Sequence, residues 1–226
     1  MKPVLFTALA LAISPLAPMA ASAQDYTPDV IELSETGPFA FEPAPQLDLS
    51  GGGAVEFWIA PSWTADPGYD PPVIVNIGPQ GIAYMVSVTR DRDALIFAND
   101  ADEDVFVTDL ADGQLHHVAI NVMEDGVEVY VDGVVIGTSA LRPLALPSSG
   151  LFVGGLGTEG SGAFEGAIAQ LRFWKEPLYA EDIVAFRLRD VVDPVAGDHP
   201  DVDNLAAVSD FTTQELLLVD GVEDTP

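Results

Sequence analysis

A dense set of oxygen ligands lies in the run Asn99-Asp100-Ala101-Asp102-Glu103-Asp104. Carboxylate and amide oxygens on a flexible turn are the ligands that Ca²⁺ prefers. We therefore predict a calcium site formed by Asn99, Asp100, Asp102 and Asp104, while a solvated acidic turn remains the alternative for the same residues. A second acidic set near the C-terminus lacks the Gly and the final Glu of a helix-loop-helix calcium loop; it consists of Asp198, Asp201, Asp203 and Asn204.

The same acidic run is the place where a pair of catalytic carboxylates would be sought. Asp100, Asp102 and Asp104 are spaced by two, which puts their side chains on one face if the segment is a strand. Retaining glycosidases need two carboxylates about 5–5.5 Å apart across the sugar bond. The run lies in an expected turn, and Glu56 is alone on its own segment. We therefore predict no catalytic residue and keep a hydrolase as an alternative.

Two adjacent histidines, His116 and His117, are the other residues that suggest metal or acid–base chemistry. Neighbouring residues of a strand point to opposite faces, so these two rings cannot bind one ion together. The chain has no Cys, which removes the usual remaining ligands of a zinc site. We predict a structural role for both histidines.

Two aromatic residues, Trp63 and Tyr69, lie in a segment rich in Pro and Gly between Pro61 and Pro72. Such loops often carry binding residues on a rigid scaffold. We predict that these two side chains contact the ligand. Trp58 and Trp174 lie in apolar segments and are expected to pack in the interior.

The charge of the chain excludes some classes of partner. Among 226 residues there are 36 Asp and Glu against 8 Lys and Arg, which gives a formal net charge of −28. Binding to phosphate requires basic side chains, so nucleic acids and anionic membranes are not expected partners.

The first 23 residues have the features of an export signal. Lys2 precedes an apolar stretch from Val4 to Ile13, and Ala21-Ser22-Ala23 forms a typical cleavage site. The apolar stretch is too short to span a bilayer. We predict a periplasmic or extracellular protein without a membrane span after cleavage of residues 1–23.

Short apolar alternations separated by Gly, Pro, Asn and Asp recur through the middle of the chain, which predicts an all-β sandwich or barrel. Asp132-Gly133 is a strong hairpin signal, because a type I′ turn needs positive φ at both positions. The expected strands include 55–59, 82–88, 95–97, 105–107, 116–122, 127–131, 134–138, 151–153 and 167–174. One short helix is predicted at Glu181–Arg189.

The composition changes after residue 189. Residues 190–226 contain no Lys or Arg and ten Asp or Glu, and they are too few to bury a core of their own. We predict one domain over 24–189 and an acidic C-terminal extension, 190–226, that packs on the domain or trails from it. Within the extension, Phe211–Val219 is apolar enough to dock as a strand or short helix.

Four blocks of the chain resemble the laminin-G-like jelly roll of the concanavalin A-like lectin/glucanase superfamily. They are Pro38–Trp63, Gly113–Thr138 with its Tyr-x-Asp-Gly hairpin, Gly150–Gly155, and Ala163–Ile183. The resemblance implies an antiparallel jelly-roll β-sandwich. It also implies a choice of functions, because this fold serves lectins, adhesion modules and enzymes.

We expect a secreted, non-catalytic binding or adhesion module that recognises a glycan or a surface protein, with Ca²⁺ as a candidate cofactor. Two alternatives stay open. One is a glucanase-type glycoside hydrolase, and the other is a structural protein of the cell envelope.

Overall fold

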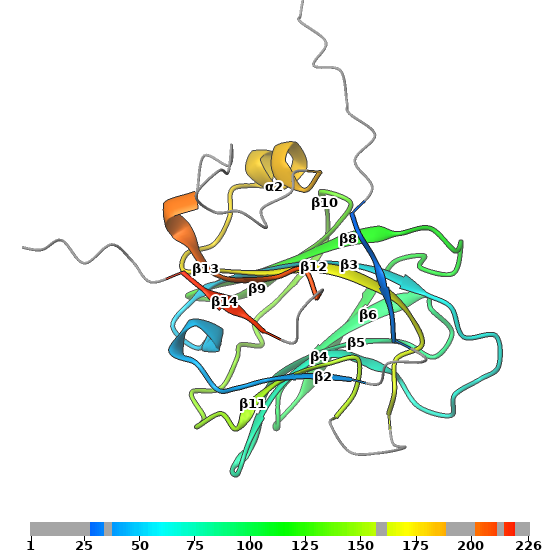
Figure 1. Ribbon diagram of the computed structural model, residues 1–226, viewed down its shortest axis with the longest axis horizontal. Helices are drawn as coiled ribbons and strands as arrows, with labels where there is room; N and C mark the ends of the chain where they lie inside the picture. Colours follow the sequence, from blue (N-terminus) through cyan, green and yellow to red (C-terminus); the bar gives the residue numbers. More distant parts are fainter. Residues whose placement is uncertain (1–27, 34–37, 157–161, 189–201, 212–214, 220–226) are drawn as a thin grey trace, which may run out of the picture.

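The computed structural model describes residues 28–33, 38–156, 162–188, 202–211 and 215–219. Two antiparallel sheets pack face to face as a β-sandwich (Figure 1), which confirms the predicted all-β jelly-roll class. The predicted export signal, 1–23, lies outside the described residues, as do Asp198 and Asp201 of the second acidic set.

The larger sheet has eight strands and contains the His-bearing strand near its centre. Its order is β10 (Val134–Ser139), β9 (Gly126–Val131), β8 (His116–Met123), β3 (Gly53–Pro61), β12 (Gly166–Trp174), β13 (Leu205–Ser209) and β14 (Leu217–Leu218), with β1 (Ile31–Glu32) also pairing with β12. All these pairings are antiparallel.

The smaller sheet has six strands and carries the predicted acidic turn at one edge. Its order is β2 (Phe39–Phe41), β11 (Gly150–Val153), β4 (Pro72–Gly78), β5 (Gly81–Val88), β6 (Ala94–Ala98) and β7 (Glu103–Val107). The acidic turn joins β6 to β7 at this edge.

The core between the sheets follows from strand alternation. Val55, Phe57 and Ile59 of β3 are buried between the sheets, while Glu56 and Trp58 lie on the opposite face of the strand. Side chains that alternate in this way let each sheet bury one continuous apolar face. The row of Val127, Val129 and Val131 on β9 faces the same core, as predicted.

The hairpin between β9 and β10 is confirmed. Asp132 and Gly133 both have positive φ, 53° and 80°, which is the geometry of a type I′ turn. The Asp132 side chain also accepts a hydrogen bond from the backbone N–H of His117 (2.9 Å), so the turn is tied to the neighbouring strand.

The single predicted helix is present but begins and ends earlier than expected. Helix α2 runs from Ala180 to Phe186. The backbone of Leu178 just before it is held on both sides by the Asn121 amide of β8, at 2.9 and 2.8 Å. Ile183 is buried against the large sheet as predicted, whereas Val184 is exposed.

The predicted C-terminal extension contributes a strand, β13, that was not predicted from the sequence. All five residues of β13 are buried, and β13 pairs with β12. The two-residue strand β14 lies within the segment predicted to dock, and it pairs with β13. This part of the extension is therefore built into the large sheet.

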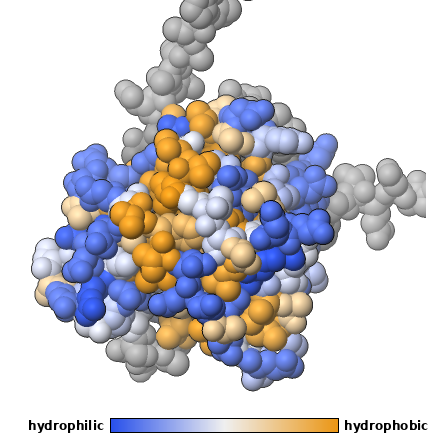
Figure 2. Space-filling view, turned by 180° about the vertical axis from the view of Figure 1, so that it is seen from behind, coloured by the Kyte–Doolittle hydropathy of each residue, from blue (hydrophilic) through white to orange (hydrophobic). Residues whose placement is uncertain are grey.

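Apolar side chains also reach the surface. Figure 2 shows an apolar area on the reverse face of the molecule, bordered by polar residues. Exposed valines include Val105 and Val107 on β7, and Val134 and Val135 on β10. None of the helices in the part of the chain that the structure describes has the length and apolar character needed to cross a bilayer.

Candidate functional site

A short 3₁₀ helix, η1 (Pro45–Leu47), forms the ridge on which the candidate site is built. Pro45 occupies the first turn, where its missing N–H leaves no hydrogen bond unmade. Leu47 is fully buried, and its carbonyl accepts hydrogen bonds from Asn76 Nδ2 (3.0 Å) and Tyr84 Oη (2.9 Å). Two strands of the smaller sheet, β4 and β5, therefore hold the ridge in place.

The other wall comes from the segment between β10 and β11. Leu144 N–H donates to the Ala83 carbonyl (2.9 Å), and Ser149 N–H donates to the Ile77 carbonyl (2.8 Å). These bonds fix the segment along β4 and β5.

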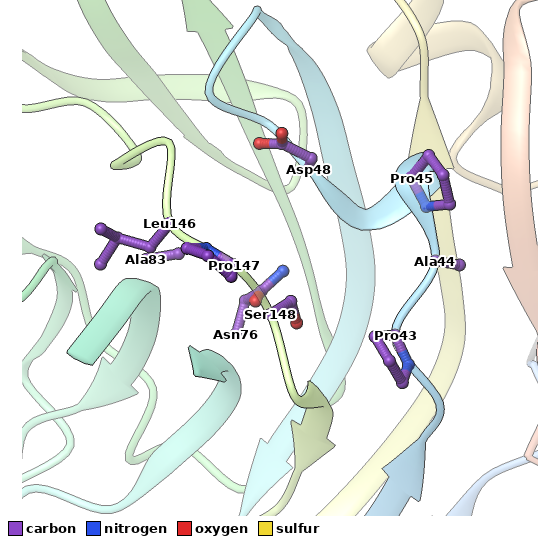
Figure 3. Close-up of a pocket in the computed structure, with 9 residues that line it drawn as sticks. All are labelled: Pro43, Ala44, Pro45, Asp48, Asn76, Ala83, Leu146, Pro147 and Ser148. Atoms are coloured by element: carbon purple, nitrogen blue, oxygen red, sulfur yellow. The ribbon is translucent and has the colours of Figure 1, made fainter. Parts of the chain in front are cut away.

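A hollow of about 280 Å³ lies between this segment and η1 (Figure 3). In the figure, Asn76 and Ser148 lie between Pro147 on one side and the Pro43–Pro45 segment on the other. The lining residues are Pro43, Ala44, Pro45, Asp48, Asn76, Ala83, Leu146, Pro147 and Ser148. The hollow is thus mainly apolar, with a small number of polar side chains, as is common in ligand sites.

The amide of Asn76 is the most informative group in the hollow. The side chain is only 2% exposed, and its Oδ1 has no hydrogen-bond partner in the described structure. Its orientation is determined because the Leu47 carbonyl can only accept, so Nδ2 must face Leu47 and Oδ1 must be the end without a partner. The oxygen itself has almost no accessible surface, so a ligand hydroxyl reaches it only if the side chains that cover it shift.

Asp48 and Ser148 differ from Asn76 in how far their atoms are already used. Asp48 is exposed and uses Oδ1 to accept from Ser50 N–H (2.9 Å). Ser148 Oγ is engaged with the backbone of Gly150, at 3.2 and 3.0 Å. Asp48 therefore offers carboxylate oxygen to a ligand, while Ser148 shapes the wall.

A second hollow of about 270 Å³ lies on the other side of the ridge and shares Pro45 and Asp48 with the first. Its other lining residues are Gln46, Leu49, Gly52, Trp174, Lys175 and Ala206. Gln46 Oε1 is buried and has no hydrogen-bond partner in the described structure. Each hollow is therefore lined by an amide residue whose buried oxygen has no hydrogen-bond partner in the described structure.

The structure corrects half of the predicted ligand contacts. Trp63 is 4% exposed, packs edge-on against Phe164 and donates from Nε1 to the Arg90 carbonyl (2.7 Å). Its ring is a core residue because the loop folds back onto the sandwich. Tyr69 is 39% exposed and donates from its hydroxyl to the Ala163 carbonyl (3.0 Å), so its role as a contact residue stays a prediction.

The predicted calcium ligands do not converge on one point. Asn99 Oδ1 accepts from Ala101 N–H and Asp102 N–H, at 2.8 and 3.0 Å, and Asp102 Oδ1 accepts from Glu103 N–H (2.9 Å). Asp100 turns toward the backbone of Ile82, and Asp104 bonds to Ser139 Oγ. The described residues contain no group of three or more acidic or His side chains arranged to hold a metal.

This arrangement corrects the prediction of one calcium site shared by Asn99, Asp100, Asp102 and Asp104. Short acidic side chains in a tight turn bond to their own backbone, which leaves them without a common centre. Calcium binding elsewhere on the chain stays a prediction.

A buried polar network on the outer face of the large sheet was not foreseen. Glu56 Oε1 accepts from Trp174 Nε1 (2.9 Å) and faces Arg172 Nη1 at 3.4 Å. Glu56 Oε2 lies 3.1 Å from His117 Nε2, although the ring is not aligned for a straight hydrogen bond. Burial alone would raise the pKa of Glu56, but the His117 and Arg172 interactions outweigh it and lower the pKa to about 2.

The network includes a local distortion of β12. Gln170 has φ of 46° at the point where the register of β12 on β3 shifts. This β-bulge places the Gln170 side chain beside Arg172, whose Nη2 donates to Gln170 Oε1 (2.5 Å). Glu56 is therefore a closed structural carboxylate, 2% exposed, and is out of reach of a substrate.

His116 and His117 diverge to opposite faces, as predicted. His116 Nδ1 lies 2.8 Å from Asp132 Oδ2, and its Nε2 lies 3.0 Å from Asp112 Oδ1. The hydrogen bond to Asp132 raises the pKa of His116, burial opposes this, Asp112 adds to it, and the resulting pKa is about 9. His116 is therefore a charged clamp between two carboxylates at neutral pH.

The clamp predicts a pH dependence of stability. A histidine whose pKa rises on folding stabilises the protein fully below its unfolded value near 6.5, and this stabilisation is lost as pH rises through about 9. Because Asp112 and Asp132 are partly exposed, we expect about 1–2 kcal/mol. Urea unfolding of the wild-type protein and His116→Gln between pH 6 and 10 measures it. Equal pH dependence in both proteins would contradict the clamp.

The residues of the two hollows were not predicted from the sequence. Asn76 does carry a signal, since it is the one polar residue within the apolar strand Pro72–Gly78. Gln46 and Asp48 lie in a Pro-rich segment with no periodic pattern. Only the folding of η1 against β4 and β5 brings them together with the segment before β11.

The chain matches a known family over most of its length. The family model described as the concanavalin A-like lectin/glucanases superfamily matches residues 33–184. A comparison with curated proteins gives no match.

Solved structures with a similar fold include proteins of different kinds. A protein from Bacteroides ovatus, proposed to bind carbohydrate, has a TM-score of 0.56 and 15% identity over 78% of this chain and 50% of that chain. The carbohydrate-binding module CBM40 of the Ruminococcus gnavus IT-sialidase, bound to sialyllactose, has a TM-score of 0.48 and 12% identity, covering 59% and 81%. A pentraxin from Limulus polyphemus has a TM-score of 0.48 and 17% identity, covering 75% and 80%.

At 15% identity, the likeness to the Bacteroides ovatus protein concerns the fold alone. The chain spans half the length of the Bacteroides ovatus protein.

Proposed function

The chain belongs to the concanavalin A-like lectin/glucanases superfamily, and from this premise we propose that it is a non-catalytic glycan-binding module that acts outside the cytoplasm. Its site is the hollow between η1 and the segment before β11. The experiment below also tests the alternative that the protein binds a protein partner and not a glycan.

The observation that carries the proposal is the Asn76 amide oxygen. A buried acceptor without a partner costs about 1–3 kcal/mol, and Asn76 Oδ1 is such an acceptor on a side chain that lines the hollow. A sugar hydroxyl that donates to it after a shift of the covering side chains would recover part of this free energy. The proline rings around it provide apolar surface for the C–H faces of a sugar.

The carboxylates of the described residues favour binding over catalysis. Among the residues that line the two hollows, Asp48 is the one carboxylate, whereas canonical glycoside hydrolysis needs a pair. Glu56 is closed in its network, and the carboxylates of the acidic turn bond mainly to backbone groups. These features support a protein that holds a glycan without cleaving it.

A glycan array followed by calorimetry on the purified protein tests the proposal. We expect Asn76→Ala and Asp48→Ala each to weaken binding of the array ligand by about tenfold or more, which corresponds to about 1.4 kcal/mol. Thermal unfolding of both variants shows whether the fold is kept. Binding is expected to survive a chelator, and soluble β-glucans are expected to stay intact.

Tyr69→Ala is the matched control, because Tyr69 is the exposed aromatic residue of the other candidate loop. Loss of binding in Tyr69→Ala with normal binding in Asn76→Ala would move the site to that loop. Absence of any glycan ligand on the array would count against the proposal as a whole, and a chelator-sensitive ligand would show that calcium takes part.

A further inference from the structure

The strands that end the two sheets differ in how well they are protected against pairing with another chain. Among the described residues these strands are β2 and β14, of three and two residues, together with β10 and β7. Short edge strands and β-bulges keep a sheet edge from pairing, and β10 has a register shift between Val135 and Gly137. Strand β7 pairs with β6 over five residues without a shift. It is therefore the long, regular edge of the sandwich.

The free side of β7 presents backbone groups to solvent. Thr108, which follows β7, donates its N–H to the Asp93 carbonyl just before β6 (2.9 Å). Hydrogen-bonded pairs alternate with non-bonded pairs along an antiparallel ladder, so the N–H and C=O groups of Val107 and Val105 point away from β6. No strand of the described residues follows β7 in the sheet, and the described contacts give these groups no partner on that side.

The side chains of β7 that face outward are apolar at its centre. Val105 is 54% exposed and Val107 is 80% exposed, and strand alternation puts both on the face opposite Phe106. Phe106 is buried and packs onto Gly137 of β10. This contact anchors β7 to the other sheet, so the edge is held in position before a partner arrives, which lowers the cost of binding.

The surroundings of β7 are acidic. The exposed acidic residues next to the two valines in the sequence are Asp102, Glu103, Asp104 and Asp109. Residues 93–141, which form all the strands from β6 to β10, contain no Lys or Arg. A negative field of this kind attracts a cationic partner and repels an anionic one.

The charge argues against a second copy of the chain as the occupant of this edge. Each copy carries a formal net charge of −28, and pairing through β7 would bring two acidic edges together. A basic segment would neutralise the same carboxylates.

We propose that β7 is a docking edge for an extended, basic segment of a protein partner, which adds to the smaller sheet as a further strand. Main-chain hydrogen bonds to Val105 and Val107 supply the affinity, and alternate side chains supply the specificity. Partner side chains opposite the valines are apolar, and those near Glu103 and Asp104 are Lys or Arg. The lining residues of both hollows lie outside β6, β7 and β10, so this inference does not depend on the proposed function.

Selection from a phage library of random dodecapeptides on the full-length protein tests the inference. We expect enrichment of peptides in which Val, Ile or Thr occupy alternate positions and Lys or Arg lie at one end or both. The strongest hit, made as a synthetic peptide, is then measured by calorimetry. Its affinity should fall as NaCl rises from 50 to 500 mM, because salt screens the exposed charges.

Backbone methylation of the synthetic peptide tests the mode of binding. A strand directs alternate N–H groups to each side, so methylation of one alternate set of amides should abolish binding, and methylation of the other set should leave the affinity within about threefold. These peptides act on the wild-type protein, so they decide the matter whether or not a variant folds.

Val105→Pro removes one N–H on the free side of β7. Proline is tolerated on an edge strand where the N–H faces solvent, so the ladder with β6 is kept. We expect Val105→Pro to weaken the peptide by at least about fivefold, since one hydrogen bond is lost. Val105→Thr, which keeps the N–H and the β-branched shape, is the matched control and should bind within about twofold of the wild-type protein. Thermal unfolding of both variants shows whether the fold is kept.

Glu103→Lys tests the charge. We expect it to weaken a basic peptide by at least about threefold. Glu165→Lys makes the same change at an exposed position just before β12 of the larger sheet and should leave the affinity unchanged.

The remaining outcomes overturn the inference. They are a library without enriched peptides, hits without basic residues, and methylated peptides that both bind or both fail. A dimer of the purified protein that Val105→Pro abolishes would assign the edge to a second copy instead. Glycan binding should be the same in Val105→Pro and the wild-type protein, so the two proposals fail independently.

Discussion

Glu56→Gln is expected to lower the free energy of unfolding by about 3–5 kcal/mol, which is the range for breaking a buried ion pair. The substitution keeps the shape of the side chain and removes the one negative charge that faces Arg172 and His117 within the network. Glu56 and Arg172 are both nearly inaccessible to water, so solvent cannot replace the lost charge.

The same variant should change the acid limb of the stability curve. The pKa of Glu56 is lowered from 4.5 to about 2 on folding. A carboxylate with a depressed pKa stabilises the protein above its unfolded pKa, and this stabilisation is lost as pH falls toward the folded pKa. Stability of Glu56→Gln should therefore vary less between pH 5 and 2 than stability of the wild-type protein.

Urea unfolding at pH 7 and a pH series in the acid range measure both effects. Glu124→Gln, at an exposed turn between β8 and β9, is the control and should lie within about 0.5 kcal/mol of the wild-type protein. The double variant Glu56→Gln/Arg172→Met should be less destabilised than the sum of the single variants, with a coupling of at least about 1 kcal/mol. Additive effects would show that the pair does not interact as the structure describes.

Leu205→Ala is expected to lower the free energy of unfolding by about 2–5 kcal/mol, the range for removing a large buried aliphatic side chain. Leu205 is fully buried and packs with Trp174, Leu178 and Ile183 on the face of the large sheet beneath α2. It begins β13, so the loss would show that the C-terminal segment stabilises the sandwich.

Leu217→Ala provides the same chemical change on the neighbouring strand β14, where Leu217 is half exposed. We expect an effect below about 1 kcal/mol, because little apolar surface returns to water there. Similar, small effects of both substitutions on thermal unfolding would mean that the C-terminal segment trails from the domain and does not complete the sheet.

Several elements were predictable because their signals are local. The inward rows Val55, Phe57, Ile59 and Val127, Val129, Val131 follow from strand alternation. The Asp132-Gly133 turn follows from the two positive φ angles that a type I′ hairpin needs. The strand β13 was missed because Leu205–Ser209 lies in a segment whose acidic composition conceals five buried residues.

The acidic run illustrates what local composition leaves open. The alternating carboxylates of Asn99–Asp104 suit calcium by their chemical type, but ligand geometry depends on where each side chain turns. In the fold, Asp100 faces the backbone of Ile82 on β5, and Asp104 faces Ser139 on β10. Contacts between strands disperse the carboxylates that the sequence places side by side.

The sequence by itself determined the sandwich class and the divergence of His116 and His117, because the two-residue period of a strand assigns each side chain to a face. The tertiary structure alone decided which residues form the candidate site. Gln46 and Asp48 come from one segment, Asn76 and Ser148 come from two others, and the three segments carry no shared pattern. These residues line the hollows around η1 because Leu47 is buried and its carbonyl accepts hydrogen bonds from Asn76 and Tyr84. Such long-range contacts leave no periodic pattern in the sequence.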